Sequence, residues 1–376
     1  MKGNMKLYEP IKVGGLDFKN RVTWAPMVNR RADMQGFISE DNKNFYLKIA
    51  KSGVAMLVIE ATNVTMAVPT FPSLCDDAYV PKFKEMMDLI HSETDCKVFV
   101  QIYDPLPEYL GVEDVPVPRI QHFVNCMIMA AVRAQKAGSD GVEIHAAHAY
   151  WLSCFLSFRN KRKDEYGQNL EGRMKMLLDI IHGIREKCGN DYPIGVRING
   201  DEFLVGGNTL QQTTKIAPKL AELGIAYLSI SAGGKYQDTW GPDDTLFRMP
   251  YPIPGPWKQV RGYSGHRATP PAYMPDGVNV YLAEAIKKSM KGYNVPVITA
   301  GKIPNTELAE EILQEGKADI IGICRALFCD FELLIKSREG REKEIVKCAY
   351  CLTCMERTRL GRAECVKWNE KNPGCK

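Results

Sequence analysis

The chain has 376 residues, of which 45% are hydrophobic and 25% charged, and its formal net charge is +4. This is an ordinary globular composition, and so small a net charge gives no reason to expect a nucleic-acid or membrane partner. No apolar run approaches the roughly 18 residues that span a bilayer, and the N-terminus lacks the apolar core of a secretory signal, so we expect a soluble, cytoplasmic protein.

Short apolar segments rich in valine and isoleucine alternate along the chain with amphipathic segments. Eight of these apolar segments are expected to be strands: Arg21–Met27, Ala55–Val64, Lys97–Tyr103, Gly141–His148, Pro193–Gly200, Tyr227–Gly234, Pro296–Lys302 and Ile320–Ala326. They show no strict alternation of apolar and polar residues, which is typical of parallel strands buried on both faces. Helices are expected between them, among others at Leu170–Cys188, Gln211–Leu223 and Thr306–Glu315.

Eight such units predict either a parallel barrel or a doubly wound sheet. No G-x-G-x-x-G motif follows any of the predicted strands, which argues against a dinucleotide-binding sheet. We therefore predict an α/β fold, a (β/α)8 TIM barrel over residues 1–340, followed by a cysteine-rich segment at residues 341–376.

A barrel of this kind carries its active site at the C-terminal ends of its strands. The polar residues predicted at those ends are Glu60, Gln101, His145, His148 and Arg197. The last three strands end in glycine-containing segments: Ser231-Ala-Gly233-Gly234, Ala300-Gly301-Lys302 and Gly322-Ile-Cys-Arg325. Glycines let backbone N–H groups approach a phosphate closely, although a single glycine can simply end a strand.

The tail of the chain contains closely spaced cysteines, Cys348, Cys351 and Cys354, with Cys365 further on. In a chain without a signal peptide, this spacing indicates a metal site rather than a set of disulfides. It favours an iron–sulfur cluster, and a structural zinc ion is the alternative.

The segment from Lys235 to Gly277 is longer than an ordinary barrel loop and is rich in aromatic residues and proline. It could form a pocket for a flat apolar ligand, a surface excursion or a contact between subunits. If the segment forms a contact between subunits, the protein is a homo-oligomer.

The most specific block of the sequence is Asp140-Gly-Val-Glu-Ile-His-Ala-Ala-His-Ala-Tyr150. Together with the N-terminal segment Leu7–Val22 and the terminal cysteines, this block resembles the Old Yellow Enzyme family of FMN-binding barrels. The resemblance is strongest to the iron–sulfur branch that contains 2,4-dienoyl-CoA reductase and trimethylamine dehydrogenase.

The resemblance implies a role for each matching residue. His145 and His148 would hold a substrate oxygen, and Tyr150 would supply a proton. The residues implied to contact the flavin ring are Pro26, Met27, Ala61, Gln101 and Arg197. Those implied to hold its phosphate are Ser231, Gly233, Gly301, Gly322 and Arg325. Four of the tail cysteines, Cys348, Cys351, Cys354 and Cys365, would ligate a 4Fe-4S cluster.

The chain also departs from the family at several positions. Relatives often carry a cysteine or threonine where this sequence has Val28, and valine cannot donate a hydrogen bond to the flavin. The histidine and Gly-Arg pair that usually follow Gln101 are missing, which alters one wall of the substrate pocket. Cys324 stands where a glycine usually precedes Arg325.

These features together predict an FMN-dependent ene-reductase for the C=C bond of an α,β-unsaturated carbonyl, enoate or enoyl thioester. Alternatives are amine oxidation of the trimethylamine dehydrogenase type, an RNA-modifying flavin barrel, or a zinc-tailed nucleic-acid binder that would use Arg357, Arg359, Arg362 and Lys367. Fused relatives continue beyond the cysteines, whereas this sequence ends at Lys376. Electrons could therefore come from NAD(P)H directly, or from a separate flavoprotein through the cluster.

Overall fold

The computed structural model describes residues 5–104, 112–204, 206–234 and 263–368. Most of the predicted aromatic loop, residues 235–262, lies outside this range, as does the segment at 105–111 that follows the third barrel strand. None of the helices in the described ranges is long and apolar enough to cross a membrane.

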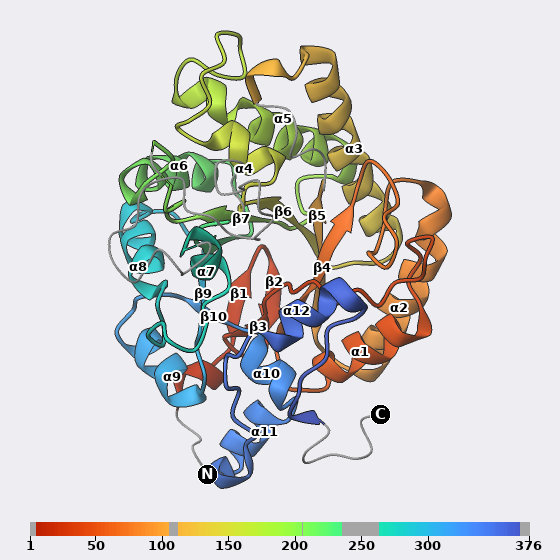
Figure 1. Cartoon of the computed structure of the whole chain (residues 1–376), viewed down its shortest axis with the longest axis vertical. Coiled ribbons are helices and arrows are strands. Elements are labelled where there is room, and N and C mark those ends of the chain that lie inside the picture. The colour runs from red at the N-terminus through yellow and green to blue at the C-terminus, as the bar shows by residue number, and fades with distance from the viewer. Residues whose placement is uncertain (1–4, 105–111, 205, 235–262, 369–376) are drawn as a thin grey trace.

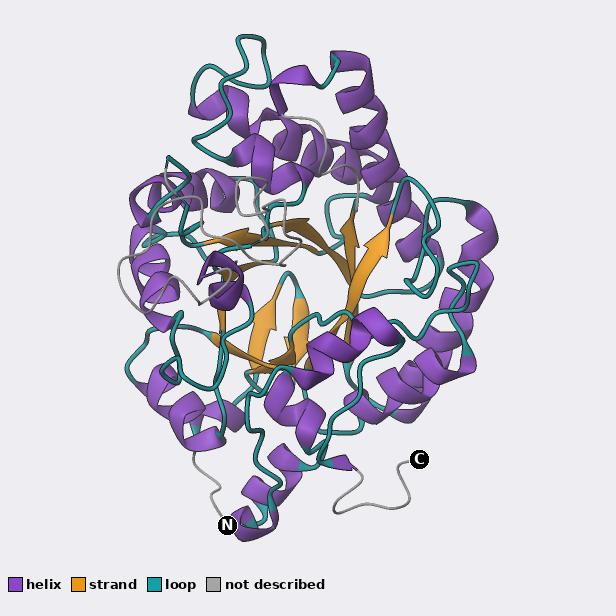
Figure 2. Ribbon diagram, in the orientation of Figure 1, coloured by secondary structure: helices purple, strands orange, loops and turns teal. Residues whose placement is uncertain are grey.

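Eight parallel strands close into a barrel surrounded by helices, which confirms the predicted (β/α)8 fold (Figures 1 and 2). The barrel strands are β3 (Val22–Trp24), β4 (Met56–Asn63), β5 (Lys97–Tyr103), β6 (Gly141–Ala146), β7 (Ile194–Asn199), β8 (Tyr227–Ser231), β9 (Val297–Ala300) and β10 (Ile320–Ile323). Each strand pairs with the next in chain order, and β10 closes the ring against β3.

The described residues form α-helices, most of which lie around the outside of this barrel (Figure 1). They are α1 (Glu40–Ala50), α2 (Val80–Glu93), α3 (Val117–Lys136), α4 (Trp151–Leu156), α5 (Leu170–Cys188), α6 (Leu210–Glu222), α7 (Tyr263–Ala268), α8 (Val280–Ser289), α9 (Thr306–Gln314), α10 (Arg325–Cys329), α11 (Leu333–Arg338) and α12 (Thr353–Leu360).

The local sequence explains where these elements begin and end. Every residue of β4 is buried, as expected of a strand covered on both faces. Helix α5 begins after Asn169, whose side chain accepts a hydrogen bond from Gly172 N, and ends at Gly189 with a φ of 89°. Asn305 caps α9 in the same way, by accepting from Leu308 N.

A short hairpin of β1 (Ile11–Val13) and β2 (Leu16–Phe18) closes one end of the barrel. Val13 and Phe18 pack against interior residues of the strands, Phe99 and Tyr227 among them. The hairpin turn requires glycine at position 14, because φ is +55° there and a Cβ would lie 2.5 Å from Ala226 Cβ. The strand ends at the opposite end of the barrel are left open for a ligand.

The C-terminal segment folds back over this open end. Helix α12 lies beside the first barrel units in Figure 1, and Ala363 N donates to Asn29 O at 2.9 Å. Further on, Trp368 Nε1 donates to Phe328 O at 2.8 Å, and the two rings lie 4.5 Å apart. The segment is therefore packed onto the barrel along its described length, and the boundary at residue 340 stays a prediction.

Candidate active site

A cavity of about 680 Å³ opens at the C-terminal ends of the barrel strands. Its size lies within the range of roughly 300–1,000 Å³ that is usual for small-molecule sites. Almost all the residues expected to be catalytic or to bind FMN line it: Pro26, Met27, Ala61, Gln101, His145, His148, Tyr150, Arg197, Ser231, Gly301, Gly322 and Arg325. The exception is Gly233, which does not line the cavity and whose backbone N–H donates a hydrogen bond to Asp201 O at 2.8 Å.

The three candidate catalytic side chains form a tight group on one wall. The ring of His145 lies 5.0 Å from the rings of both His148 and Tyr150. The ring of Tyr103 packs edge-on against Tyr150, also at 5.0 Å. A substrate atom bound against these side chains can therefore contact more than one of their polar groups at once.

His145 is held in its neutral form. It is buried, with 4% of its surface exposed, and this burial, reinforced by His148 and Arg197, lowers its pKa well below the ordinary value. Its Nδ1 atom is buried without a hydrogen-bond partner. A neutral imidazole can still donate one hydrogen bond, and it does so without a change of charge.

The backbone at His148 is unusual, because His148 and Ala149 have φ values of 64° and 69°. Backbone in this left-handed region is rare for residues with a side chain and often marks a functional site. The conformation depends on Gly234, three residues after the end of β8, where a Cβ would lie only 2.3 Å from the carbonyl carbon of His148. The structure thus gives this glycine a packing role that the sequence did not suggest.

Ser231 links this wall to Arg197. Its Oγ lies 2.6 Å from His148 Nε2 and 3.4 Å from Arg197 Nη2. In the structure Ser231 therefore contacts the histidine and arginine side of the cavity, whereas the resemblance implied a contact with phosphate.

Gln101 is oriented by a buried carboxyl group one layer below. Its Nε2 donates to Glu143 Oε1 at 2.7 Å, and the Tyr227 hydroxyl donates to Glu143 Oε2 at 3.0 Å. Burial raises the pKa of Glu143, while Arg197 opposes that shift. Glu143 was not among the predicted residues, although its place two residues before His145 on the same strand puts both side chains on the interior face.

Gly301, Gly322 and Arg325 lie on the other side of the cavity, at β9 and β10. A Cβ at Gly301 would lie 2.6 Å from Asn279 Nδ2, so only glycine leaves this wall open. Arg325 Nη1 donates to Pro270 O at 2.7 Å, and its guanidinium group lies 4.7 Å from the ring of Tyr350. Asn279 and Tyr350 also line the cavity and were not predicted, because they come from a helix start and from the tail.

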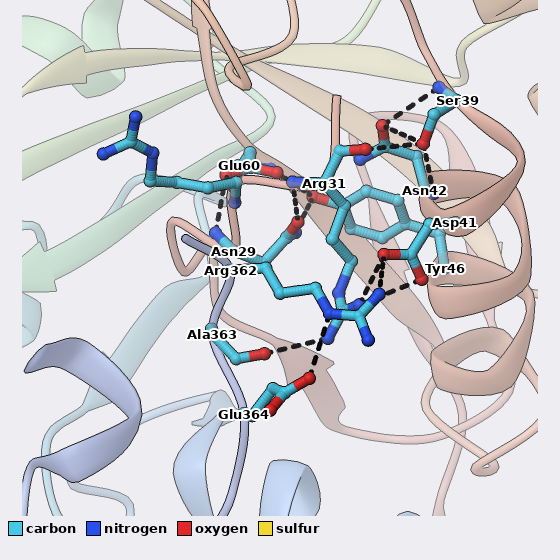
Figure 3. Close-up of polar contacts among 11 residues, drawn as sticks. Asn29, Arg31, Ser39, Asp41, Asn42, Tyr46, Glu60, Arg362, Ala363 and Glu364 are labelled. Atoms are coloured by element: carbon cyan, nitrogen blue, oxygen red, sulfur yellow. Dashed lines mark hydrogen bonds and ion pairs between the residues drawn. The ribbon is translucent and has the colours of Figure 1, made fainter. Parts of the chain in front are cut away.

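A buried polar network joins the first barrel loop to the C-terminal segment (Figure 3). Glu60 Oε2 accepts from Asn29 N at 2.6 Å, and Asn29 Nδ2 donates to the Tyr46 hydroxyl at 3.0 Å. Two residues after Asn29, Arg31 donates to Asp41 from Nη1 and to Ala363 O from Nη2 at 2.8 Å. Burial raises the pKa of Glu60 to about 8.

The four predicted cluster ligands, Cys348, Cys351, Cys354 and Cys365, line a second, small pocket. Tyr350 and Arg325 line both this pocket and the barrel cavity, so the two are neighbours. Within the described residues, however, no three histidine, cysteine or acidic side chains are close enough together to hold a metal ion. The thiol of an unpredicted cysteine, Cys329, lowers the pKa of the Cys365 thiol.

The cysteines thus share a pocket without forming a ready ligand set, and the cluster remains a prediction. Tyr350 and Leu352 have φ values of 51° and 64°, so the backbone turns sharply through the cysteine run.

The fold and the cavity define a flavin-binding oxidoreductase barrel, and residues 6–120, 113–236 and 257–344 match the NADH:flavin oxidoreductase / NADH oxidase family. The chain belongs to this family of FMN-dependent oxidoreductases.

Two relatives illustrate the relationship at the level of sequence. The chain is 34% identical over 374 residues to an NADH oxidase of Thermoanaerobacter brockii, an alignment that covers 92% of this chain and 52% of the relative. It is 28% identical over 428 residues to a cinnamate reductase of Clostridium sporogenes, covering 100% of this chain and 59% of that protein. The chain therefore spans little more than half the length of these curated relatives.

Solved structures support the fold. A 2-naphthoyl-CoA reductase in complex with 2-naphthoyl-CoA superposes with a TM-score of 0.82 at 24% identity, covering 98% of this chain and 58% of that one. A morphinone reductase in complex with tetrahydroNAD gives a TM-score of 0.67 at 20% identity, covering 90% of this chain and 92% of that one.

Proposed function

We propose that this chain is an ene-reductase that reduces the C=C bond of an α,β-unsaturated carbonyl, enoate or enoyl-thioester substrate. The observation that carries the proposal is the group of His145, His148 and Tyr150 on the wall of a cavity that Gln101 and Arg197 also line. Relatives named for the reduction of cinnamate and of 2-naphthoyl-CoA support this substrate class.

The cavity residues suit a bound FMN. Arg197 has Nε and Nη1 buried without partners, and Asn279 Oδ1 is likewise unpartnered, so donors and an acceptor remain available for a polar ligand. The residues that would hold the ring are Pro26, Met27, Ala61, Gln101 and Arg197. Gly301, Gly322 and Arg325 would hold the phosphate, and Ser231 and Gly233 stay weaker candidates for it.

Bound FMN would supply the hydride that reaches the β-carbon of the alkene. Side chains of the protein would meet the other two requirements, stabilisation of the developing charge and donation of a proton. His145 and His148 would donate hydrogen bonds to the substrate oxygen and stabilise the negative charge that develops there. The Tyr150 hydroxyl would donate its proton to the α-carbon and recover one from water.

The alternatives are weaker on this geometry. A cationic amine would enter a cavity lined by the guanidinium groups of Arg30, Arg197 and Arg325, which repel it. The predicted nucleic-acid surface of the tail is partly neutralised, because Arg362 pairs with Asp41 at 2.8 Å and Arg357 with Glu364 at 3.5 Å. Reduction of a C=C bond is the activity that the cavity supports best.

For the electron supply we keep two routes, NAD(P)H acting directly in the cavity or a separate flavoprotein acting through an iron–sulfur cluster at the tail. The family to which the chain belongs supports NADH as a donor. The cluster proposal is supported by the shared pocket of the four cysteines next to the cavity.

The test is anaerobic purification followed by reduction and reoxidation of the flavin. We expect non-covalent FMN, since valine at position 28 cannot bond to the ring, and we expect simple enones to reoxidise the reduced flavin. A colourless protein that takes up no FMN would contradict the cofactor assignment. A flavoprotein that no activated alkene reoxidises would contradict the activity.

A further inference from the structure

Arg30 places a guanidinium group in the cavity at a position that the proposed flavin site does not use. It follows the residues expected along the flavin edge and lines the cavity together with Phe71 and Thr358. Its Nε donates to Thr70 Oγ1 at 2.8 Å, and its Nη1 donates to Thr358 O at 2.9 Å. The ring of Phe71 lies 5.0 Å from the guanidinium carbon.

The backbone also fixes this side chain in place. Arg30 has a φ of 57°, a conformation that residues with a side chain rarely adopt. Its N–H donates to the buried Glu60 carboxyl group at 3.3 Å, and the preceding N–H of Asn29 donates to the same oxygen. A side chain held by two elements and by a strained backbone is preorganised for a ligand.

No carboxylate in the described part of the chain neutralises the positive charge of Arg30. Across residues 5–104, 112–204, 206–234 and 263–368, no carboxylate forms an ion pair with Arg30, Arg197 or Arg325, and the side chain of Arg30 donates to neutral oxygens. The neighbouring Arg31, by contrast, pairs with Asp41 at 2.7 Å. An uncompensated guanidinium group in a concave site attracts an anion and can hold it through charge-assisted hydrogen bonds.

Arg30 lies away from the part of the cavity wall formed by His145, His148 and Tyr150. It follows β3, whereas His145 belongs to β6, and β4 and β5 separate these two strands in the ring. An oxygen held by the histidines is therefore not the group that Arg30 would bind. The rings of Phe71 and Tyr103 also line the cavity, which suits an aromatic substrate body.

We propose that Arg30 forms an anion subsite, which binds a carboxylate or phosphate that the substrate carries at a distance from its activating carbonyl. This inference rests on the proposed function, and it narrows the substrate class from activated alkenes in general to anionic ones.

The experiment compares two probes that differ only at the remote end. They are the methyl ketone 4-(4-carboxyphenyl)but-3-en-2-one and its methyl ester, which share one enone. Dissociation constants are measured from the absorbance change of the oxidised flavin, for the wild type, Arg30→Gln, Arg30→Lys and the control Arg338→Gln. Arg338 is an exposed arginine on α11 that stacks on Tyr8, so its replacement makes the same change of charge outside the cavity.

We expect the wild type to prefer the acid, and Arg30→Gln to reduce that preference by about 10- to 100-fold, the scale of a charge-assisted hydrogen bond. Arg30→Lys should restore part of the preference, and Arg338→Gln should keep all of it. An equal preference in the wild type and Arg30→Gln would overturn the proposal. Binding is read without turnover, so a failure of the proposed activity would show separately, as no reoxidation by either enone.

Two further measurements identify the source of the anion. If Arg30→Gln weakens the binding of NADH while leaving the preference between the probes intact, the substrate subsite is overturned and the anion belongs to the nicotinamide donor. If Arg30→Gln loses FMN that Arg338→Gln retains, Arg30 serves the cofactor, and the proposal is equally overturned.

Discussion

Tyr150 is the residue on which the proposed chemistry depends most directly. It is half-buried, and its ring contacts both His145 and Tyr103 at 5.0 Å. Replacing it with phenylalanine removes only the hydroxyl group, so Tyr150→Phe should retain FMN and the shape of the wall. We expect reoxidation of the reduced flavin by a simple enone to slow by about 10²–10⁴-fold, the usual contribution of a positioned acid.

Stopped-flow absorbance of the pre-reduced flavin measures this rate. A nitroalkene should be reduced at nearly the wild-type rate, because its stabilised carbanion can take a proton from water. Tyr103→Phe is the matched control, since Tyr103 lines the same cavity. If Tyr150→Phe is as fast as the wild type with both substrates while Tyr103→Phe is slow, Tyr103 supplies the proton instead.

The burial of Glu60 should make the free energy of unfolding of the protein depend on pH. Its pKa is about 8 in the folded protein, raised above the ordinary value of 4.5 mainly by burial. Between these two pH values the folded protein holds a proton that the unfolded chain has released. The contribution of Glu60 to the free energy of unfolding is therefore complete below pH 4.5 and is lost as the pH rises to about 8.

Glu60→Gln carries no charge at any pH and keeps a carbonyl oxygen that can accept from Asn29 N. We therefore expect the free energy of unfolding to fall less steeply between pH 5 and pH 8 in this variant than in the wild type. It is measured by urea unfolding with FMN in constant excess. Glu93→Gln, at an exposed pair with Lys51, should keep the wild-type slope. Identical slopes in all three proteins would show that Glu60 is already ionised in the folded state.

At the scale of elements, the contact between the first barrel loop and the C-terminal segment depends on Arg31. This side chain is 5% exposed, pairs with Asp41, donates to Ala363 O and lies 4.6 Å from the ring of Phe45. Arg31→Met keeps the packing and removes the charged donors. We expect a loss of about 1–3 kcal/mol in the free energy of unfolding, the scale of hydrogen bonds to charged groups.

Protease cleavage should also become faster within residues 361–368 of this variant, because their anchor is removed. Arg362→Met is the control, since Arg362 also pairs with Asp41 but is 49% exposed, and such pairs contribute at most about 1 kcal/mol. Equal effects of the two substitutions would mean that the buried arginine holds the segment no better than the exposed one.

The elements themselves were largely predictable from the sequence. Each expected barrel strand is present, and Leu170–Cys188 is a helix with the expected bounds. The predicted strands were commonly too long at their C-terminal ends: the segment expected to run to His148 ends at Ala146, and the one expected to run to Gly234 ends at Ser231. At these ends the backbone leaves the sheet to present side chains to the cavity, as the left-handed φ of His148 shows.

The site was predictable on the strands and in the few residues that follow their C-terminal ends. His145, Gln101 and Arg197 follow from their positions at strand ends, since parallel strands bring those ends together. Arg30 and Tyr350 were not found, because contacts with distant segments place them at the cavity. Arg30 donates to Thr358 O, 328 residues away, and Tyr350 in the tail packs against Arg325. No local pattern encodes such a contact.

At the scale of the whole molecule, the C-terminal segment and the barrel share a wall. Arg325 and Tyr350 line both the barrel cavity and the cysteine pocket. The barrel core, in contrast, is built from strands and helices that precede the cysteines. Changes in the cysteine pocket should therefore affect a bound metal without removing the fold that would hold FMN.

Cys354→Ala tests this separation. Cys354 is buried at 9% exposure and lines the cysteine pocket. Replacing it with alanine removes one proposed cluster ligand and only one small group from the packing. We expect the anaerobically purified variant to lose most of its iron and acid-labile sulfide, because three thiolates hold a cluster less well than four. FMN content per chain should stay at the wild-type level.

Cys188→Ala is the matched control, because Cys188 is half-buried at the end of α5 and lines neither the barrel cavity nor the cysteine pocket. It should retain iron, sulfide and FMN. About one zinc ion per wild-type chain with no sulfide would instead assign the cysteines to a structural site. If the wild type contains neither iron nor zinc, the proposed cluster and the electron route through it are overturned.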